Sequence, residues 1–120
     1  MAQPQPFPTD LTHYNSDGVV TVIPPDHTAV PIQQFLASLN RRWRNAKNTG
    51  LVQQIPWFPD FINGAPTHYT LQSMRSGNAI VLKVFGHPSG RYFRSIDTFL
   101  IHVVSIMVGN GFANCNCGLF

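Results

Sequence analysis

The sequence contains no glutamate, and charged side chains of any kind are scarce. Its 120 residues include five Asp and eight Lys or Arg, so charged residues make up 11% of the chain and the formal net charge is +3. Soluble domains usually carry about 25% charged residues. The five Asp are scattered, and no nucleophile–base motif accompanies them, so the sequence predicts a protein that is not an enzyme and takes no small-molecule substrate.

Further absences exclude other classes. No run of about 18 apolar residues exists, so no membrane contact is expected, and residues 1–8 lack the basic and apolar regions of a secretory signal. The only cysteines, Cys115 and Cys117, cannot form a disulfide framework. One residue separates them, where zinc sites use two to four. Two thiols with His87 or His102 could in principle hold a metal, but no metal and no cofactor are predicted.

Arginine is the most common charge, with six of the eight cations. Its planar guanidinium suits planar anions and base edges better than a diffuse cationic surface would. Composition therefore hints at nucleic acid, although many neutral domains reach a similar net charge. The length fits one domain.

Local patterns in the first half predict an arm, a strand and a helix. Residues 1–13 are Pro-rich and are expected to be flexible, and the β-branched run Val19–Ile23 predicts a short strand ended by two prolines. Apolar residues spaced by three and four predict a helix over residues 30–48. Arg41 and Arg44 fall on its far side, where they either form a solvated face or contact phosphate.

Residues 51–67 combine turn formers with three aromatic side chains. Trp57, Phe58 and Phe61 are expected to lie against the core. The alternative is an exposed aromatic surface that binds a partner.

The second half predicts a β-hairpin and a helix. Strands are expected over residues 68–74 and 79–85, joined by a turn at Ser76-Gly77-Asn78. A tight loop at 86–90 leads to Ser95, an N-cap for a helix that buries an apolar stripe and ends at Gly109. His102 lies near this stripe and is expected to be hydrogen-bonded rather than a ligand. The fold class is α+β: a small antiparallel sheet, the hairpin plus short strands, packed against two helices. The single domain spans 14–112, and 113–120 is a Cys-containing tail.

The strongest local motif is the loop before this helix. Arg91 and Arg94 flank an aromatic pair, and Arg94 precedes the Ser95 cap. A guanidinium on a rigid backbone can make bidentate contacts with guanine or phosphate. The alternative is that Arg94 pairs with Asp97 or with a backbone carbonyl.

Pro88, Gly90, Arg91, Phe93, Arg94 and Ser95 resemble the signature of methyl-CpG-binding domains. The resemblance implies that a hairpin, this loop and a helix approach the DNA major groove, with Arg94 as a base-reading residue and Arg75 beside the hairpin turn as a second contact. The strand over residues 79–85 lacks the Asp and the Tyr that such domains use around the methyl groups, so no clear methyl-CpG selectivity is expected.

A wider resemblance extends from about residue 14 to 117. In order, Ser16-Asp17-Gly18, Arg42-Trp43, Tyr69-x-Leu71, the loop motif, Phe99-x-x-His102 and Cys115-x-Cys117 resemble the N-terminal part of fungal cryptic-loci-regulator transcription-silencing proteins. That family implies a nuclear heterochromatin complex which joins histone deacetylation to nucleosome remodelling.

Two functional hypotheses follow. The main one is a non-enzymatic chromatin module that contacts duplex DNA through Arg75, Lys83, Arg91, Arg94, Ser95, Arg41 and Arg44. The alternative is a protein–protein docking module among the subunits of a silencing complex, which would use Trp57, Phe58 and Phe61 or the last helix.

Overall fold

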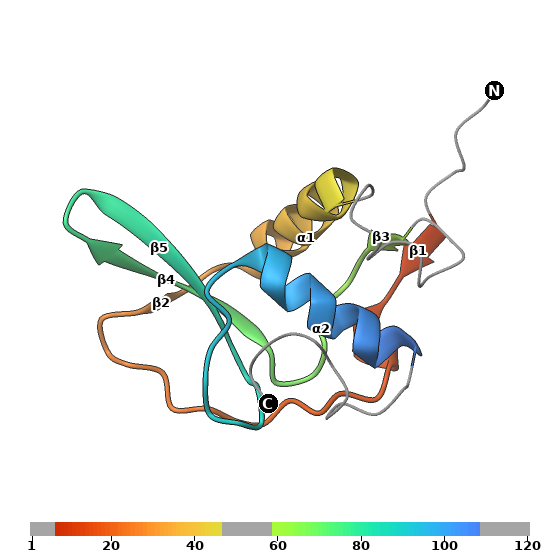
Figure 1. Ribbon diagram of the computed structural model, residues 1–120, viewed down its shortest axis with the longest axis horizontal. Coiled ribbons are helices and arrows are strands. Elements are labelled where there is room, and N and C mark those ends of the chain that lie inside the picture. Colours follow the sequence, from red (N-terminus) through yellow and green to blue (C-terminus); the bar gives the residue numbers. More distant parts are fainter. Residues whose placement is uncertain (1–6, 47–58, 109–120) are drawn as a thin grey trace.

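The computed structural model describes residues 7–46 and 59–108 (Figure 1). In this part of the chain, two α-helices lie beside a three-stranded sheet and a separate two-stranded pair, which confirms the predicted α+β class. No helix of the described part is long and apolar enough to cross a membrane. The elements in chain order are β1 Phe7–Thr9, the 3₁₀ turn Leu11–His13, β2 Thr28–Ala29, α1 Ile32–Ala46, β3 Pro59–Phe61, β4 Thr70–Ser76, β5 Ala79–Phe85 and α2 Ile96–Val108.

The larger sheet is antiparallel in the order β2-β4-β5, and β1 pairs with β3 in parallel. The register of the hairpin sets Leu71 opposite Val84 and Arg75 opposite Ile80. Val84 also forms a bridge with Phe93, which brings the loop after β5 onto the outer edge of that strand. The far end of the β4–β5 hairpin extends away from both helices (Figure 1).

The helices form where their apolar stripes predict them. Pro31 stands just before α1, a position where its missing N–H costs nothing. Phe35, Leu39 and Trp43 are each at most 1% exposed, whereas Arg41 and Arg44 point to solvent. The N–H of Thr98 donates to Ser95 Oγ at 3.2 Å, which confirms the N-cap of α2.

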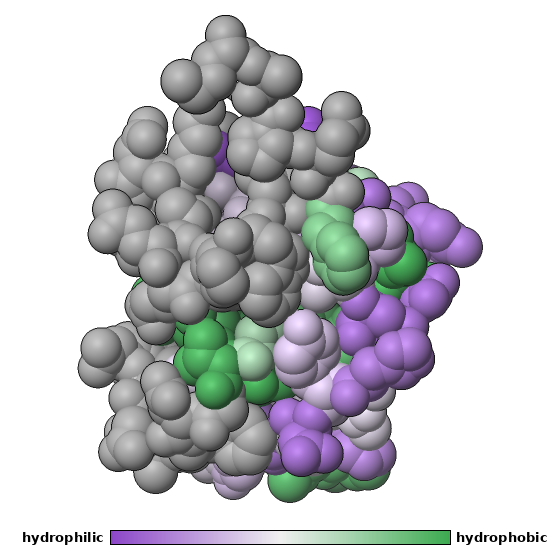
Figure 2. Space-filling view, turned by 90° about the vertical axis from the view of Figure 1, so that its right-hand side faces the viewer, coloured by the Kyte–Doolittle hydropathy of each residue, from purple (hydrophilic) through white to green (hydrophobic). Residues whose placement is uncertain are grey.

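Aromatic rings fill the centre of the core. The ring of Phe99 packs against Phe35, Tyr69 and Phe93 with centroid distances of 5.8, 5.2 and 5.3 Å. Since Phe93 and Phe99 are fully buried, the loop before α2 and the helix itself share this core. Figure 2 views the molecule from its β1–β3 end. On the surface seen there, hydrophobic residues lie in separate areas with hydrophilic residues between them.

The predicted strand at Val19–Ile23 is wrong. Only Val19 makes a sheet-like bond, from its N–H to the carbonyl of Gly86 at 2.8 Å, while Val20 and Val22 are 82% and 93% exposed. Strand propensity has no effect without a partner strand. In this fold Thr28 and Ala29 pair with β4 instead.

The predicted flexible arm is wrong from Phe7 onward. Residues Phe7–Thr9 pair with β3, Leu11 is fully buried, and Asp10 caps the 3₁₀ turn by accepting from the N–H of Thr12 at 2.9 Å. The contacts that order this segment come from residues about 50 positions away, so local composition gave no sign of them.

The hairpin and its flanking turns agree with the sequence. Strand β5 has the predicted bounds, and β4 begins two residues later than expected. Gly77, Gly86 and Gly90 have φ values of 61°, 128° and 81°, conformations that favour glycine. A Cβ at Gly86 would lie 2.6 Å from the carbonyl oxygen of His68, whereas a Cβ at Gly90 would meet no atom within 4 Å.

These two glycines make a matched pair for a stability test. Both substitutions force a side chain into a disfavoured conformation, but only Gly86→Ala adds a backbone clash. We expect Gly90→Ala to lower the free energy of unfolding by about 1 kcal/mol and Gly86→Ala by about 3 kcal/mol. Urea unfolding followed by tryptophan fluorescence measures both, and equal losses would contradict the close approach at Gly86.

Candidate functional site

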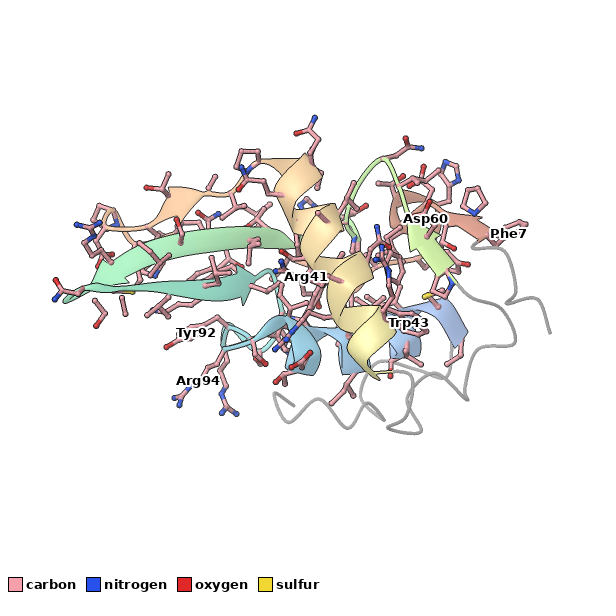
Figure 3. All side chains as sticks on the ribbon, turned by 90° about the horizontal axis from the view of Figure 1, so that it is seen from above. Phe7, Arg41, Trp43, Asp60, Tyr92 and Arg94 are labelled. Atoms are coloured by element: carbon pink, nitrogen blue, oxygen red, sulfur yellow. The ribbon has the colours of Figure 1, made fainter. Side chains whose placement is uncertain are left out.

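The loop between β5 and α2 forms an open hollow with two arginines at its rim. Residues Gly90–Arg94 and Thr98 line the hollow, whose volume is about 470 Å³. Arg91 and Arg94 are exposed, and in the part of the chain that the structure describes neither guanidinium forms an ion pair. Figure 3 shows Arg94 directed away from the body of the protein, near Tyr92.

Tyr92 links this hollow to the sheet. Its ring packs on Phe85 with centroids 5.4 Å apart, and Nζ of Lys83 lies 4.5 Å from the ring centroid. A cation over an aromatic face is held by the ring quadrupole. The structure thus brings three of the predicted DNA-contacting cations, Lys83, Arg91 and Arg94, to neighbouring positions around one aromatic side chain.

The predicted alternative for Arg94, a pair with Asp97, is not formed. Asp97 instead accepts from Arg42 Nη2 at 2.9 Å, a partly exposed ion pair that joins α1 to α2. Ser95 uses its hydroxyl on Thr98, with Oγ and Oγ1 2.8 Å apart. The backbone on either side of Arg94 is therefore fixed, by the buried Phe93 and by the Ser95 cap, as the sequence predicts.

The other predicted cations do not join this hollow. Arg75 is exposed near the hairpin tip, opposite Ile80, and Arg41 and Arg44 are exposed on α1. In Figure 3, Arg41 is labelled beside helix α1 and Arg94 on the loop below Tyr92. The phosphate contacts of α1 stay a prediction.

Of the three aromatic residues predicted to bind a partner, the structure describes only Phe61. Trp57 and Phe58 lie outside the described residues. Phe61 is 2% exposed, with its ring 5.8 Å from that of Trp43. The side-chain amide of Asn40 bonds both backbone groups of Phe61: its Oδ1 accepts from the N–H at 2.8 Å, and its Nδ2 donates to the carbonyl at 3.1 Å. A partner surface at Phe61 is therefore wrong, and its expected place against the core is confirmed.

The exposed apolar side chains on β5 were not predicted from the sequence. Ile80 and Leu82 lie on the face that Val84 continues into the core, yet they are 61% and 38% exposed. Strand β5 is apolar except for Lys83, so its sequence does not distinguish the exposed positions from the buried ones. Only the structure shows that the hairpin extends beyond the helices that cover its base (Figure 1).

The histidines that could hold a metal lie in the core. His87 and His102 are fully buried, and Nε2 of His102 lies 2.9 Å from a carboxylate oxygen of Asp17, which confirms that His102 is hydrogen-bonded. Burial, reinforced by His102 and Arg91, lowers the pKa of His87 below the usual value, so its imidazole is neutral at pH 7. Cys115 and Cys117 lie outside the described residues.

Comparison with known proteins identifies this arrangement. Residues 61–119, which include β4, β5, the arginine-rimmed loop and α2, match the family model of the transcription-silencing protein, cryptic loci regulator Clr2. Residues 61–119 are therefore similar to the Clr2 transcription-silencing family. The resemblance to cryptic-loci-regulator transcription-silencing proteins that the motifs indicated is thereby confirmed.

A solved structure supports the same family. The chain is similar to one from the structure of Clr2 bound to the Clr1 C-terminus, with a TM-score of 0.63 and 25% identity over 92% of the present chain. It spans 29% of the length of that chain. No curated protein matches the sequence. A specific likeness to methyl-CpG-binding domains is not among these matches and stays a prediction.

The cap and the ion pair at the start of α2 can be separated by mutation. Ser95→Ala removes the acceptor for the N–H of Thr98 and should lower the free energy of unfolding by about 1 kcal/mol. Arg42→Ala breaks only a partly exposed ion pair and should cost about 0.5 kcal/mol or less. Chemical denaturation compares the two, and a larger loss for Arg42→Ala would contradict this order.

Proposed function

We propose that this domain is a non-enzymatic docking module of a nuclear transcription-silencing complex, and that it binds an extended segment of a Clr1-like subunit. The observation that carries the proposal is the similarity, over 92% of the chain, to a chain from the structure of Clr2 bound to the Clr1 C-terminus. The matched family of transcription-silencing proteins supports the same setting. The docking hypothesis therefore takes precedence over DNA contact.

The outer edge of β5 is the surface that we assign to docking. The N–H and carbonyl of Val84 both bond to Phe93, at 3.0 and 2.9 Å, so they point away from β4. Because backbone groups alternate along an antiparallel strand, those of Leu82 and Ile80 point the same way. No strand of the described chain pairs with them there. An added strand would continue the pairing that Phe93 begins.

The side chains around this edge define the partner. Ile80 and Leu82 offer apolar contacts on one face of the sheet, and residues 70–95 carry four cations, Arg75, Lys83, Arg91 and Arg94, with no acidic residue. Peptides that add to a sheet edge gain affinity from main-chain bonds and specificity from alternate side chains. The partner segment is therefore an extended, acidic peptide with apolar residues at alternate positions.

A proline on the open edge tests the docking mode. Leu82→Pro removes an N–H that points away from β4, so the hairpin keeps its internal bonds. We expect this variant to bind a peptide of the Clr1-like C-terminal segment at least about tenfold more weakly, because a main-chain bond is lost and the added strand is displaced. Fluorescence anisotropy with labelled peptide measures the affinity.

Leu82→Ala is the matched control, since it removes the apolar side chain but keeps the N–H. Its affinity should lie between those of the wild type and Leu82→Pro. Circular dichroism confirms that each variant is folded. A folded Leu82→Pro that binds the peptide as well as the wild type would contradict docking at this edge, and absence of binding by the wild type would contradict the docking function itself.

A second candidate function is weak contact with duplex DNA. The observation that favours it is the open hollow rimmed by Arg91 and Arg94, whose guanidinium groups no described acid engages. The fixed backbone around Arg94 lets its side chain bind with a small loss of entropy. With few cations available, affinity should be micromolar or weaker and should fall steeply with salt.

Arg94→Ala separates a DNA contact from a structural role. The side chain is exposed and its loss removes no core packing, so the fold should stay intact while DNA binding weakens by about 1–3 kcal/mol. Arg41→Ala is the matched control on α1 and should mainly reduce the salt slope, by about one unit at most. Titrations of methylated and unmethylated duplex over a range of salt measure both effects.

If Arg94→Ala unfolds the domain but leaves the affinity per folded molecule unchanged, Arg94 is a structural residue and the DNA assignment is wrong. Equal losses for Arg94→Ala and Arg41→Ala would indicate a diffuse cationic attraction rather than a specific contact. Because Leu82→Pro alters no charge, it should leave the DNA affinity unchanged.

A further inference from the structure

Three potential metal ligands from distant parts of the sequence meet in the core. Asp17 lies in the segment before β2, His87 in the loop after β5, and His102 in the middle of α2. One donor atom of each lies within 4.8 Å of the other two. Both histidines are fully buried, and the side chain of Asp17 is 7% exposed.

The donor atoms already face one another. Nε2 of His102 lies 3.0 and 2.9 Å from the two carboxylate oxygens of Asp17. The imidazole of His87 is beside that of His102, with ring centroids 5.0 Å apart. Nδ1 of His87 accepts from the Ser89 backbone N–H at 3.1 Å and lies 2.8 Å from Ser89 Oγ, so Nε2 is the nitrogen on the other side of the ring from Ser89.

We propose that Asp17, His87 and His102 bind a divalent transition-metal ion, with zinc as the best fit. Imidazole nitrogens and a carboxylate oxygen are donors that zinc accepts. The ion takes the place of the protons on Nε2 of His102 and of His87; in each neutral imidazole that proton moves to Nδ1, so both rings stay neutral and each Nε2 supplies one nitrogen ligand. Tetrahedral coordination needs the carboxylate and the His102 nitrogen to separate by only a few tenths of an ångström.

Outer groups are in place to orient these ligands. When Nε2 of His87 holds a metal, its ring proton lies on Nδ1 and is donated to Ser89 Oγ, 2.8 Å away, in place of the bond that the Ser89 N–H otherwise donates to Nδ1. The hydroxyl of Tyr69 donates to Oδ1 of Asp17 at 2.7 Å. Ligating histidines and carboxylates are commonly fixed by hydrogen bonds of this kind. The site has its supporting shell as well as its ligands.

The role of the ion would be structural. Its ligands join the segment before β2, the loop that leads to Arg91 and Arg94, and helix α2. Because the ligands come together only in the folded chain, binding of the ion adds to folding stability. This inference is independent of the docking and DNA functions.

The test uses the full chain with Cys115→Ser and Cys117→Ser, so that thiols cannot bind the metal. Protein stripped with a chelator is titrated with Co²⁺ and then with Zn²⁺. We expect one Co²⁺ per chain with visible bands of a nitrogen and oxygen site, displacement by one Zn²⁺, and a higher melting temperature with zinc than with chelator.

Single substitutions then locate the ligands. Asp17→Asn and His87→Gln should each weaken zinc binding at least about 100-fold, and Tyr69→Phe, which removes an orienting hydroxyl only, about tenfold. His27→Gln is the matched control: its side chain is 4% exposed and its Nδ1 lies 2.8 Å from Asp26, but among residues 7–46 and 59–108 no third metal donor adjoins this pair. This control should bind zinc with the same affinity as the chain that carries only the two Cys→Ser changes.

Circular dichroism of each metal-free variant shows whether it is folded. The metal titration of the chain that carries only the two Cys→Ser changes does not depend on the ligand variants. The proposal is overturned if that chain takes up no Co²⁺ or Zn²⁺ at micromolar concentrations, or if folded Asp17→Asn and His87→Gln bind zinc undiminished. Zinc lost together with the two cysteines would also overturn it, because the metal would then belong to the thiols.

Discussion

Two backbone hydrogen bonds between Val84 and Phe93 organise the functional half of the molecule. They hold the loop after β5 against the edge of that strand, and they turn the ring of Phe93 into the core, where it packs on Tyr69 and Phe99. Once Phe93 is fixed, its neighbour Arg94 must point outward. Ser95 then stands where it can cap α2. The exposed arginines are thus a consequence of a buried phenylalanine.

The same bridge decides which part of β5 stays open. The bridge bonds the N–H and carbonyl of Val84, which point away from β4, and does not extend further along the strand. The corresponding backbone groups of Leu82 and Ile80 therefore have no partner strand in the described chain. A sheet edge of this kind is available to another chain unless something protects it. Here the hairpin extends past both helices (Figure 1), and all Lys, Arg, Asp or Glu residues within 70–95 are cationic. An acidic strand is the complement to such a surface.

Polar groups at the centre of the core form a second constraint. Asp17 accepts bonds from Tyr69 and His102, and these bonds hold the irregular segment before β2 onto the helix α2. A buried carboxylate needs such partners because an unpaired charge in the interior is costly. The segment that carries Val20 and Val22 is therefore held by its polar anchor rather than by strand pairing.

Short-range patterns were sufficient for several elements. The two helices follow from apolar residues spaced by three and four, and β5 from its β-branched run between two glycine turns. The cap at Ser95 and the burial of Phe93 follow from residue type and position alone. These features depend on neighbours within about four residues, which is the range over which local preferences act.

The tertiary structure decided everything that depends on distant partners. Phe7–Thr9 is ordered by β3, Val19–Ile23 fails to form a strand because β2 occupies the edge of β4, and Phe61 is buried because Trp43 and Asn40 meet it. The cluster of Asp17, His87 and His102 could not be predicted from any spacing, since 70 and 85 residues separate its carboxylate from its imidazoles. The sequence by itself determined which residues could pack, cap or coordinate. Only the folded chain, by closing those long loops, determined which of them meet.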